Sequence, residues 1–527
     1  MSHPSQPEQS PRASRPLAVD RVLFPAGVAL VLAVVAVGAF APEALQRYTS
    51  DALDWVTVQF GWLLTSAVNL FVVLCVVLAL SRYGRIRLGG DDERPEFATL
   101  PWVAMMFASG MGIGLMFYGA AEPLSHLADP PPGSGAEAGS VQAAEDALRQ
   151  AVFHWTLHPW AVFGMTGLAL AYATFRKGRR NRISAVFTPL LGRGGAEGSA
   201  AKLIDLLTVF ATVFGSATSL GLGALQITSG LGSLTGIPSS LGVQTVVVGA
   251  LTVAFVASAF TGVHRGVKTM STVNIVLAGA LLAFVLVLGP TTYLLDSLPA
   301  AVGAYLDRLS SLATATGAYS DVQWLGNWTL FFWAWALSWA PFVGTFIAKV
   351  SRGRTIREFI VGVLLVPSAG CAVWFTVVGG TALHTQRSGA ADLTASLDEG
   401  LEAALFHLLE TMPLHQITTG IAIVLVAVYF ITGGDSASVV LGTLTGRLRE
   451  RPNRWTVAIW GVLIGAVAAV LLAAGGLTAL QNAVVLVALP YTLVLLAMCW
   501  ALFKELRTDR GSTRVSEDRE PARREHP

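Results

Sequence analysis

The chain has 527 residues, of which 53% are hydrophobic and only 13% are charged. Soluble domains carry about 25% charged residues, so this composition excludes an ordinary soluble protein. The net charge of +2 excludes nothing by itself, because the positions of the charges matter more here than their sum. Apolar runs of about 20 residues, long enough to cross a bilayer, recur from end to end and predict an all-α polytopic membrane protein.

Hydropathy predicts twelve membrane spans along the chain. They cover residues 22–40, 57–80, 101–120, 150–174, 203–231, 240–262, 272–294, 328–348, 359–381, 415–443, 455–475 and 478–502. The polar residues before the first span carry no cleavage site of the signal-peptide kind. The three cysteines, Cys75, Cys371 and Cys499, lie inside apolar runs, so neither a disulfide framework nor a zinc site is predicted.

Basic residues follow the even-numbered spans. Examples are Arg85 after the second span, Arg179 after the fourth and Arg352 after the eighth. The odd-numbered connections are acidic or uncharged, as at Glu137 and Asp398. Because basic loops stay on the cytoplasmic side, both termini are predicted to be cytoplasmic. An even number of spans requires both termini to share one side, so the two arguments agree.

The third span contains FASGMGIGLMFYGAAEPL, in which Gly110, Gly112 and Gly114 alternate. Each glycine costs about 1 kcal/mol of helix propensity relative to alanine. Gly110 and Gly114 have the spacing of a packing face for a neighbouring helix. Gly112 lies on the opposite side and is better explained by a broken helix whose free backbone groups face a cavity. Such a break offers N–H donors to an anionic group and carbonyls to a cation.

The fourth span contains FHWTLHPWAVF. Pro159 is expected to bend this helix and to turn Trp155 and Trp160 toward one cavity. His154 and His158 lie an i, i+4 step apart. No third ligand is evident in the sequence, so ordinary core or interface histidines are the preferred interpretation over a metal site.

The eighth span lies in the tryptophan-rich stretch 327–346, NWTLFFWAWALSWAPFVGTF. On a helix, Trp335, Trp339 and Phe342 line one face, and Trp328 lies one heptad earlier. Rings that share a face can hold a cation without a counter-ion, because each π-face carries partial negative charge. An aromatic belt at the membrane interface or ordinary core packing explains the same pattern. The stretch alone does not decide between these interpretations.

Hydroxyl groups and glycines mark the fifth and tenth spans. The fifth carries a stripe of hydroxyls at Thr208, Thr212 and Ser216. Such hydroxyls usually bond back to the preceding turn or help helices pack, and on one face they also supply oxygens to Na⁺. In the tenth span, YFITGGDSAS predicts a weakened helix at Gly433 and Gly434. An ionisable residue in a membrane is a functional candidate, but a structural hydrogen-bonding role is favoured for Asp435.

Three stretches together resemble the betaine/carnitine/choline transporter family over almost the whole chain. They are SRYGRIRLGGDDERPEF with the glycine segment that follows, FHWTLHPWAVF, and NWTLFFWAWALSWAPFVGTFIAKVSRGRTIREF. The resemblance implies the leucine-transporter type of fold, in which two extra helices precede two inverted five-helix repeats. The implied divisions are an N-terminal tail 1–20, two peripheral helices and a loop 21–100, a first repeat 101–295, an outer connection 296–327, a second repeat 328–503 and a C-terminal tail 504–527.

The resemblance also implies where the substrate and the driving ion bind. In this family a trimethylammonium group sits in an aromatic box, which corresponds here to Trp155, Trp160, Phe163, Trp335 and Trp339. The substrate carboxylate is expected to face the glycine break at Gly110, Met111 and Gly112. One sodium site is expected at Thr212, Ser216 and the ring of Phe342. A second is expected at the carbonyls of Ala108, Met111 and Tyr429 and the hydroxyl of Thr432.

The chain departs from the family pattern at several of these positions. Ala336 stands where the second of two adjacent tryptophans is usual, and Phe163 stands where glycine-betaine symporters commonly have tyrosine. Each lost ring contact is worth about 1–2 kcal/mol when desolvated, so a substrate bulkier than or different from glycine betaine is expected. Gly114 resembles the sodium-coupled members, because choline/proton members tend to carry aspartate there. Gly433 replaces a serine, which removes one oxygen from the second sodium site.

Together these features predict a secondary active transporter that imports a quaternary-ammonium or related onium compatible solute by Na⁺-coupled symport. Proton-coupled choline uptake and carnitine-type antiport are the alternatives, and a membrane osmolyte sensor without transport would keep the same pocket. No paired membrane carboxylates or nucleophile–base set indicates an enzyme. Apart from Na⁺, no cofactor, transition metal or nucleic acid is expected. The resemblance implies homotrimers in the cell (inner) membrane, in contact with lipid and serving osmoprotection.

Overall fold

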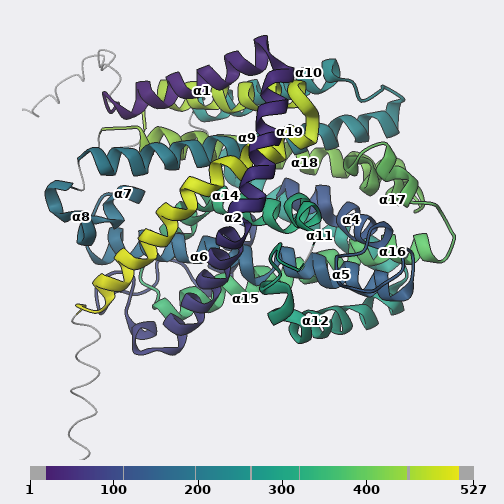
Figure 1. Cartoon of the computed structure of the whole chain (residues 1–527), viewed down its shortest axis with the longest axis horizontal. Coiled ribbons are helices and arrows are strands. Elements are labelled where there is room, and N and C mark those ends of the chain that lie inside the picture. The colour runs from purple at the N-terminus through teal and green to yellow at the C-terminus, as the bar shows by residue number, and fades with distance from the viewer. Residues whose placement is uncertain are drawn as a thin grey trace, which may run out of the picture.

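The computed structural model describes residues 19–110, 112–195, 198–261, 264–319, 321–447 and 452–509. Nearly all of these residues are helical. The β structure within these ranges is limited to two isolated bridges, Val19 with Gly446 and Arg87 with Thr355. The protein is therefore a bundle of helices, as the composition predicts (Figure 1).

The long helices differ in length and several are interrupted. In chain order they are α1 (Leu23–Phe40), α2 (Pro42–Leu80), α3 (Thr99–Gly110), α4 (Ile113–Ala128), α5 (Val141–Trp155), α6 (Leu157–Ala171), α9 (Ser199–Thr235), α10 (Leu241–Thr261), α11 (His264–Leu288), α12 (Thr291–Ala313), α14 (Phe331–Val350), α15 (Ile356–Trp374), α18 (His415–Leu444) and α19 (Arg454–Leu506). The short helices are α7 (Ile183–Val186), α8 (Thr188–Gly195), α13 (Val322–Leu325), α16 (Gly380–Arg387) and α17 (Ala404–Glu410). Turns of 3₁₀ or π type are η1 (Arg82–Arg85), η2 (Tyr172–Arg176), η3 (Gly326–Leu330), η4 (Phe375–Gly379), η5 (Thr394–Asp398) and η6 (Leu401–Ala403).

Within the described ranges, eight helices are long and apolar enough to cross a membrane, or nine if the pair α11 and α12 is one span bent by 111°. The protein is therefore an integral membrane protein with many spans. The count of twelve and the inverted repeat stay predictions. The sequence placed the start of the second span at residue 57, whereas α2 begins at Pro42, because charged residues in its first turns lower the hydropathy without interrupting the helix.

The third span is broken where the sequence predicts a break. α3 ends at Gly110 and α4 begins at Ile113, with Gly112 between them in a non-helical conformation (φ −160°, ψ −143°). Bonds from two neighbouring helices hold the beginning of α4 in place. The amide Nε2 of Gln226 on α9 donates to the carbonyl of Met116 at 2.7 Å. The indole N–H of Trp374 on α15 donates to the carbonyl of Leu115 at 2.9 Å.

The fourth span is also broken, but the break lies at Thr156 rather than at Pro159. Thr156 has φ −105° and ψ −119°, so α5 ends at Trp155 and α6 begins at Leu157. Pro159 lies in the first turn of α6, where a missing N–H removes no helical hydrogen bond. The break lies between His154 and His158, and both of their rings still pack against Phe153 and Trp333.

The tenth span has no break at its paired glycines. α18 runs from His415 to Leu444 without interruption, so the predicted weakening at Gly433 and Gly434 is not seen. A Cβ on Gly434 would lie 2.7 Å from the ring of Phe255 on α10. This glycine therefore serves close packing between helices, which is the common use of small residues in membranes.

α9 is the central helix of the bundle. It packs against α18, α14 and α19, and α19 crosses the bundle obliquely in Figure 1. Most side chains of α9 between Thr208 and Gly230 are buried. α19 is kinked at Gly475 and Gly476, between the two spans that the sequence predicts there. Gly476 has φ +59°, a left-handed conformation that favours glycine.

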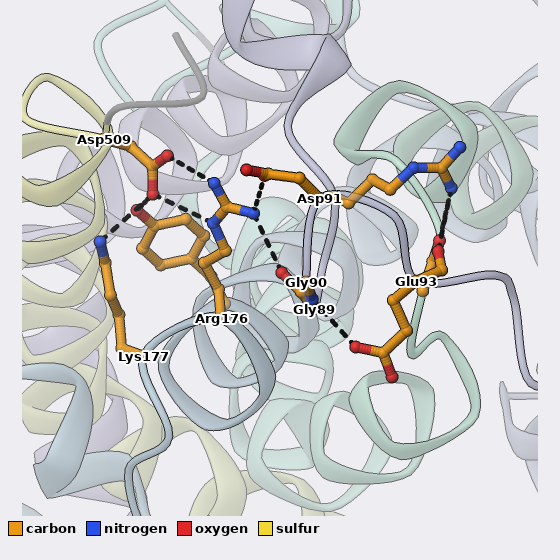
Figure 2. Close-up of polar contacts among 10 residues, drawn as sticks. Gly89, Gly90, Asp91, Glu93, Arg176, Lys177 and Asp509 are labelled. Carbon is orange, nitrogen blue, oxygen red and sulfur yellow. Dashed lines mark hydrogen bonds and ion pairs between the residues drawn. The ribbon is translucent and has the colours of Figure 1, made fainter.

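The basic connections gather at one face of the bundle together with the end of α19. Asp509 accepts a hydrogen bond from the hydroxyl of Tyr172 at 2.6 Å and forms ion pairs with Arg176 at 2.9 Å and Lys177 at 3.2 Å (Figure 2). Arg176 also donates to the carbonyl of Gly89, after α2, at 3.0 Å. These bonds join the connections after α2 and α6 to the C-terminal end of the described chain.

Two further connections, after α14 and after α18, reach the same face. Val19, where the described chain begins, pairs with Gly446 after α18. Arg87, after α2, donates to the carbonyl of Gly353 after α14 at 2.9 Å. Arg182, after α6, bonds the carbonyl of Gly446. The connections after α2, α6, α14 and α18 and both ends of the described chain therefore share one side, in agreement with the alternation of charge.

Candidate substrate site

A pocket lies where the beginning of α4, the break between α5 and α6, and the middle of α14 meet. Aromatic rings form most of its wall. Its lining residues are Gly112, Gly114, His154, Trp155, Pro159, Trp160, Phe163, Phe332, Trp335, Ala336, Trp339 and Cys371. The two interrupted spans thus bring a helix beginning and a helix break to the same place.

Trp155, Trp335 and Trp339 form a continuous wall of indole rings. Trp155 and Trp335 meet edge to face, with ring centroids 5.9 Å apart and planes at 87°. Trp335 and Trp339 follow with a centroid distance of 6.0 Å and an angle of 68°. Indole faces carry partial negative charge, so a wall of this kind favours a cation.

Each of these indoles is anchored by its N–H group. Trp335 donates to the hydroxyl of Ser219 at 3.2 Å, and Trp339 donates to the carbonyl of Gly215 at 2.9 Å, both on α9. Trp155 donates to a carboxylate oxygen of Glu122 on α4 at 2.7 Å. A buried indole needs such a partner, and the bond also fixes the orientation of the ring.

Gly114 allows the indole wall to close. A Cβ at this position would lie 2.6 Å from the ring of Trp155 and 2.7 Å from the ring of Trp335. Carbon atoms in contact lie about 3.5–4.0 Å apart, so any side chain here would push the two rings apart. The sequence analysis connects Gly114 with helix packing and with sodium coupling, and the structure shows that the close packing is against two rings of the pocket.

The rest of the wall combines rings with small side chains. Trp160 and Phe163 on α6 meet edge to face at 5.6 Å. Phe332 on α14 lies edge to face with Trp155, at a centroid distance of 5.2 Å. Ala336 and Cys371 leave the lining open between the rings. Phe332 thus adds a ring that the sequence analysis did not count, while the position of the usual second tryptophan stays small.

The beginning of α4 supplies the polar end of the pocket. Gly112 and Gly114 line the pocket, and Gly112 has no side chain that caps the helix. The first N–H groups of a helix lack partners within it, and the helix dipole places partial positive charge there. A carboxylate is the natural ligand of such a terminus, particularly where glycine allows close approach.

The structure gathers most of the substrate residues named from the resemblance. Trp155, Trp160, Phe163, Trp335, Trp339 and Gly112 line one pocket. Gly110 ends α3, where the structure describes only the backbone, and Met111 lies outside the described residues. The binding role of each residue stays a prediction.

Sequence reasoning missed several lining residues. Phe332 lies three positions before Trp335 and seven before Trp339, so a helical face count would have found it. His154, Pro159 and Cys371 line the pocket because of the break at Thr156 and the approach of α15, and no local pattern indicates either. Trp328 was expected on the same face as Trp335, but it does not line the pocket and packs against the ring of His126 at 4.6 Å.

The residues of the first expected sodium site lie on α9 and α14, the helices that carry the anchored indoles. Thr212 is buried and its hydroxyl donates to the carbonyl of Thr208 at 2.8 Å, while Ser216 is buried one turn later. Phe342 continues the row of rings, edge to face with Trp339 at 5.7 Å. A hydroxyl that donates to a carbonyl keeps lone pairs for a cation.

Tyr429 and Thr432, two residues of the second expected sodium site, lie on α18. Tyr429 lies beside Gly112, since a Cβ there would be 3.9 Å from the tyrosine ring. The hydroxyl of Thr432 donates to the carbonyl of Val428 at 2.8 Å. Ala108 belongs to α3, where the structure gives its backbone, and Met111 is outside the described residues.

An ionisable cluster lies directly behind the indole wall. Glu122, His126 and His154 are fully buried, and one ligand-type atom of each lies within 4.8 Å of the others. The sequence analysis found no third partner for its histidines and considered only Asp435 as an ionisable membrane residue. Glu122 lies two residues beyond the third span predicted from hydropathy, whereas the structure places it within α4, where a buried glutamate is a functional candidate.

Comparisons with known proteins agree with this geometry. Residues 22–511 match the description "BCCT, betaine/carnitine/choline family transporter". The chain belongs to the betaine/carnitine/choline transporter family. Members of this family are transporters rather than enzymes.

Several curated members of the betaine/carnitine/choline transporter family are similar over nearly the whole chain. The glycine betaine transporter OpuD of Bacillus subtilis is 44% identical over 93% of this chain and 95% of its own length. The betaine/ectoine transporter LcoP of Corynebacterium glutamicum is 38% identical over 94% of this chain and 79% of its own length. The ectoine/hydroxyectoine transporter of Virgibacillus pantothenticus is 37% identical over 95% of this chain and 99% of its own length.

Proposed function

We propose that the protein imports a small onium solute of the betaine type and that the aromatic pocket is its binding site. The observation that carries this proposal is the indole wall of Trp155 and Trp335, closed over Gly114 at the beginning of α4. The cationic head lies against the rings, where each desolvated cation–π contact is worth up to about 2 kcal/mol. The carboxylate lies at the N-terminus of α4, in the arrangement that broken membrane helices offer to anionic groups.

The similar proteins narrow the chemical class of the substrate. Their names include glycine betaine and ectoine transporters, and both solutes combine a cationic group with a carboxylate. The small side chains of Ala336 and Cys371 leave space between the rings that a tryptophan at position 336 would fill. We therefore include onium solutes bulkier than glycine betaine in the proposed range.

We also propose that Na⁺ drives this import. Three observations support Na⁺: the buried hydroxyls of Thr212 and Ser216 on α9, the position of Tyr429 beside the break in the third span, and a glycine rather than an aspartate at position 114. Each positive charge moved down a 100 mV potential supplies about 2.3 kcal/mol toward accumulation.

We propose an orientation for the protein on the basis of its basic face. Arg87, Arg176, Arg182 and Arg352 lie on connections at the face shared by both ends of the described chain. By the positive-inside rule this face is cytoplasmic. We further propose, from the family resemblance, that the protein is a homotrimer of the cell membrane.

Counterflow in proteoliposomes tests the proposed transport. Vesicles loaded with an excess of unlabelled glycine betaine are diluted into labelled glycine betaine, and parallel samples use choline, carnitine, ectoine and dimethylsulfoniopropionate. Labelled solute is expected to enter transiently against its gradient with at least one zwitterionic onium compound. Binding without counterflow for every compound would identify a sensor. Uptake that is unchanged when K⁺ replaces Na⁺ would refute sodium coupling.

A further inference from the structure

The cluster behind the indole wall has a bonding pattern that the proposed transport does not use. Nδ1 of His154 lies 2.6 Å from Oε1 of Glu122, and the other carboxylate oxygen accepts the N–H of Trp155 at 2.7 Å. Nε2 of His154 lies 2.9 Å from the hydroxyl of Thr329 and 3.0 Å from the amide nitrogen of Gln150. Glu122 thus links the buried histidine to a ring of the substrate pocket.

The neighbours of His154 determine where its proton lies. The amide nitrogen of Gln150 is a donor, so Nε2 of His154 acts as an acceptor. The single proton of the neutral imidazole therefore lies on Nδ1 and is donated to Glu122. In this state the carboxylate accepts two N–H groups, one from each of two neighbouring residues of α5.

His126 provides a place for one further proton. Its Nε2 lies 3.5 Å from Oε1 of Glu122, and neither of its ring nitrogens makes a hydrogen bond to the described residues. Its side chain is fully buried against the rings of Trp324 and Trp328. An imidazole without hydrogen bonds in such surroundings is costly, and protonation toward Glu122 would satisfy one nitrogen.

Charge balance favours a proton over a metal ion at this cluster. Ionised Glu122 with two neutral histidines leaves a net charge of −1 in a low-dielectric interior, and one added proton makes the cluster neutral. A divalent cation would leave it at +1. Zinc ligands at about 2.0–2.1 Å from a tetrahedral metal lie roughly 3.3 Å apart, whereas Glu122 and His154 lie 2.6 Å apart.

We propose that Glu122, His126 and His154 form a proton-binding site that competes with the cationic head of the substrate. The wall of the pocket includes both His154 and Trp155, so the cluster lies next to the proposed position of the cation. Without the added proton its negative charge attracts the cation through the indole wall. With the proton this attraction is lost. Substrate binding therefore strengthens as the pH rises and releases a proton.

Other titratable groups lie on the elements around the cluster, and their effects on the pH dependence must be distinguished from that of the cluster. On α4, the hydroxyl of Tyr118 accepts a bond from Gln481 at 3.3 Å, and on α6 His158 is 3.0 Å from the amide oxygen of Asn69. Further groups lie on the neighbouring α5, α12, α16, α17 and η6: Glu145, Asp146 with Arg149, Tyr293, Asp296, Tyr305, Asp307 with Arg308, His384, Arg387, Glu402, His407 and Glu410. His158 is the closest of these in type and burial to His154, so it serves as the control.

The test measures glycine betaine affinity of the purified full-length protein at constant Na⁺. Between about pH 5 and about pH 8, where histidines titrate, the wild-type Kd is expected to fall by up to about tenfold per pH unit. Glu122→Gln keeps an acceptor for Trp155 and is expected to give a flat profile. His126→Phe is expected to move the profile to lower pH, and it replaces Glu122→Gln if that variant does not fold. His158→Gln is expected to keep the wild-type profile.

A second readout needs no substrate. Tryptophan emission of the wild type is expected to change with pH, and Trp155→Phe and Glu122→Gln are each expected to lose that change. This readout separates the proton site from the proposed function on which the affinity test rests. If none of the zwitterionic onium compounds used in the counterflow assay binds at any pH, the proposed function fails, while the emission change still tests the cluster.

Three results would overturn the proton site. One is a wild-type Kd that does not depend on pH. Another is a pH profile of Glu122→Gln that matches the wild type. The third is a stoichiometric metal ion in the purified protein whose removal by a chelator abolishes the pH dependence, because this would assign the same residues to a metal site.

Discussion

Gly114 is the residue whose change tests the pocket most sharply. In Gly114→Ala the added methyl would lie 2.6 and 2.7 Å from the rings of Trp155 and Trp335, so the indole wall must open. We expect glycine betaine affinity to fall by at least about tenfold, which corresponds to about 1.4 kcal/mol. Binding measured by calorimetry on the purified variant checks this expectation.

Gly249→Ala is a matched control for that substitution. Gly249 lies in α10, and a Cβ there meets nothing within 4 Å. We expect unchanged affinity and a slightly more stable helix, since alanine is the better helix former. If both variants bind glycine betaine as the wild type does, the closed wall at Gly114 is not part of the binding site.

Ala336 tests substrate choice rather than substrate binding. Ala336→Trp places a ring in the part of the pocket that lies beside Cys371. We expect the preference among onium solutes to shift toward the compact trimethylammonium group, because a new ring contact and a smaller space act together. Competition assays with glycine betaine, carnitine and ectoine measure this shift. An unchanged order of affinities would show that position 336 does not select the substrate.

At the scale of elements, the two broken spans show how far sequence reasoning reaches. The break between α3 and α4 follows from alternating glycines, which lower helix propensity at Gly112. The break at Thr156 has no such signal, because threonine is tolerated in helices. Its hydroxyl bonds the carbonyl of Val152 at 2.7 Å, and its conformation depends on packing between α5, α6 and α14. Contacts between helices, rather than helix propensity, therefore determine the position of this break.

The glycines of α18 and α19 show the same limit. Paired glycines were expected to weaken α18, but Gly434 packs on Phe255 and the helix continues. Gly475 and Gly476 do kink α19, where hydropathy also predicts a boundary between two spans. A Gly-Gly pair is thus compatible with a continuous helix in α18 and with a kink in α19. The contacts with neighbouring helices distinguish the two cases. Hydropathy located most spans because it depends on composition rather than on contacts.

Gly476 provides a test of the kink in α19. A Cβ there meets nothing within 4 Å, so the cost of Gly476→Ala arises from its φ of +59° alone. We expect a loss of about 1–2 kcal/mol, the cost of the left-handed conformation for an L-residue. Thermal unfolding in detergent, with Gly249→Ala as the control, measures this loss. Equal midpoints for the two variants would mean that the kink does not need glycine.

At the scale of the whole molecule, the basic face holds the ends of several helices together. Asp509 is 3% exposed and connects α19 with Tyr172, Arg176 and Lys177 (Figure 2). Asp509→Ala leaves these donors with fewer partners, and hydrogen bonds to charged groups contribute about 1.5–3 kcal/mol. We expect a lower unfolding midpoint and unchanged glycine betaine affinity, because the pocket residues do not contact this cluster.

A matched control is Asp307→Ala. Asp307 pairs with Arg308 on α12, and both side chains are largely exposed. Exposed pairs of this kind contribute little, so its unfolding midpoint is expected to match the wild type. If Asp509→Ala also unfolds like the wild type, the cluster does not stabilise the basic face.

We propose that the protein recognises its substrate mainly by the positive charge that lies against the aromatic rings of the pocket. The direct measurement compares glycine betaine with 3,3-dimethylbutanoate, which has the same shape and carboxylate but no positive charge. One desolvated cation–π contact of about 2 kcal/mol corresponds to roughly 30-fold in affinity. We predict that the analogue without the positive charge competes at least about 30-fold more weakly with labelled glycine betaine. Equal competition by the two compounds would contradict the claim.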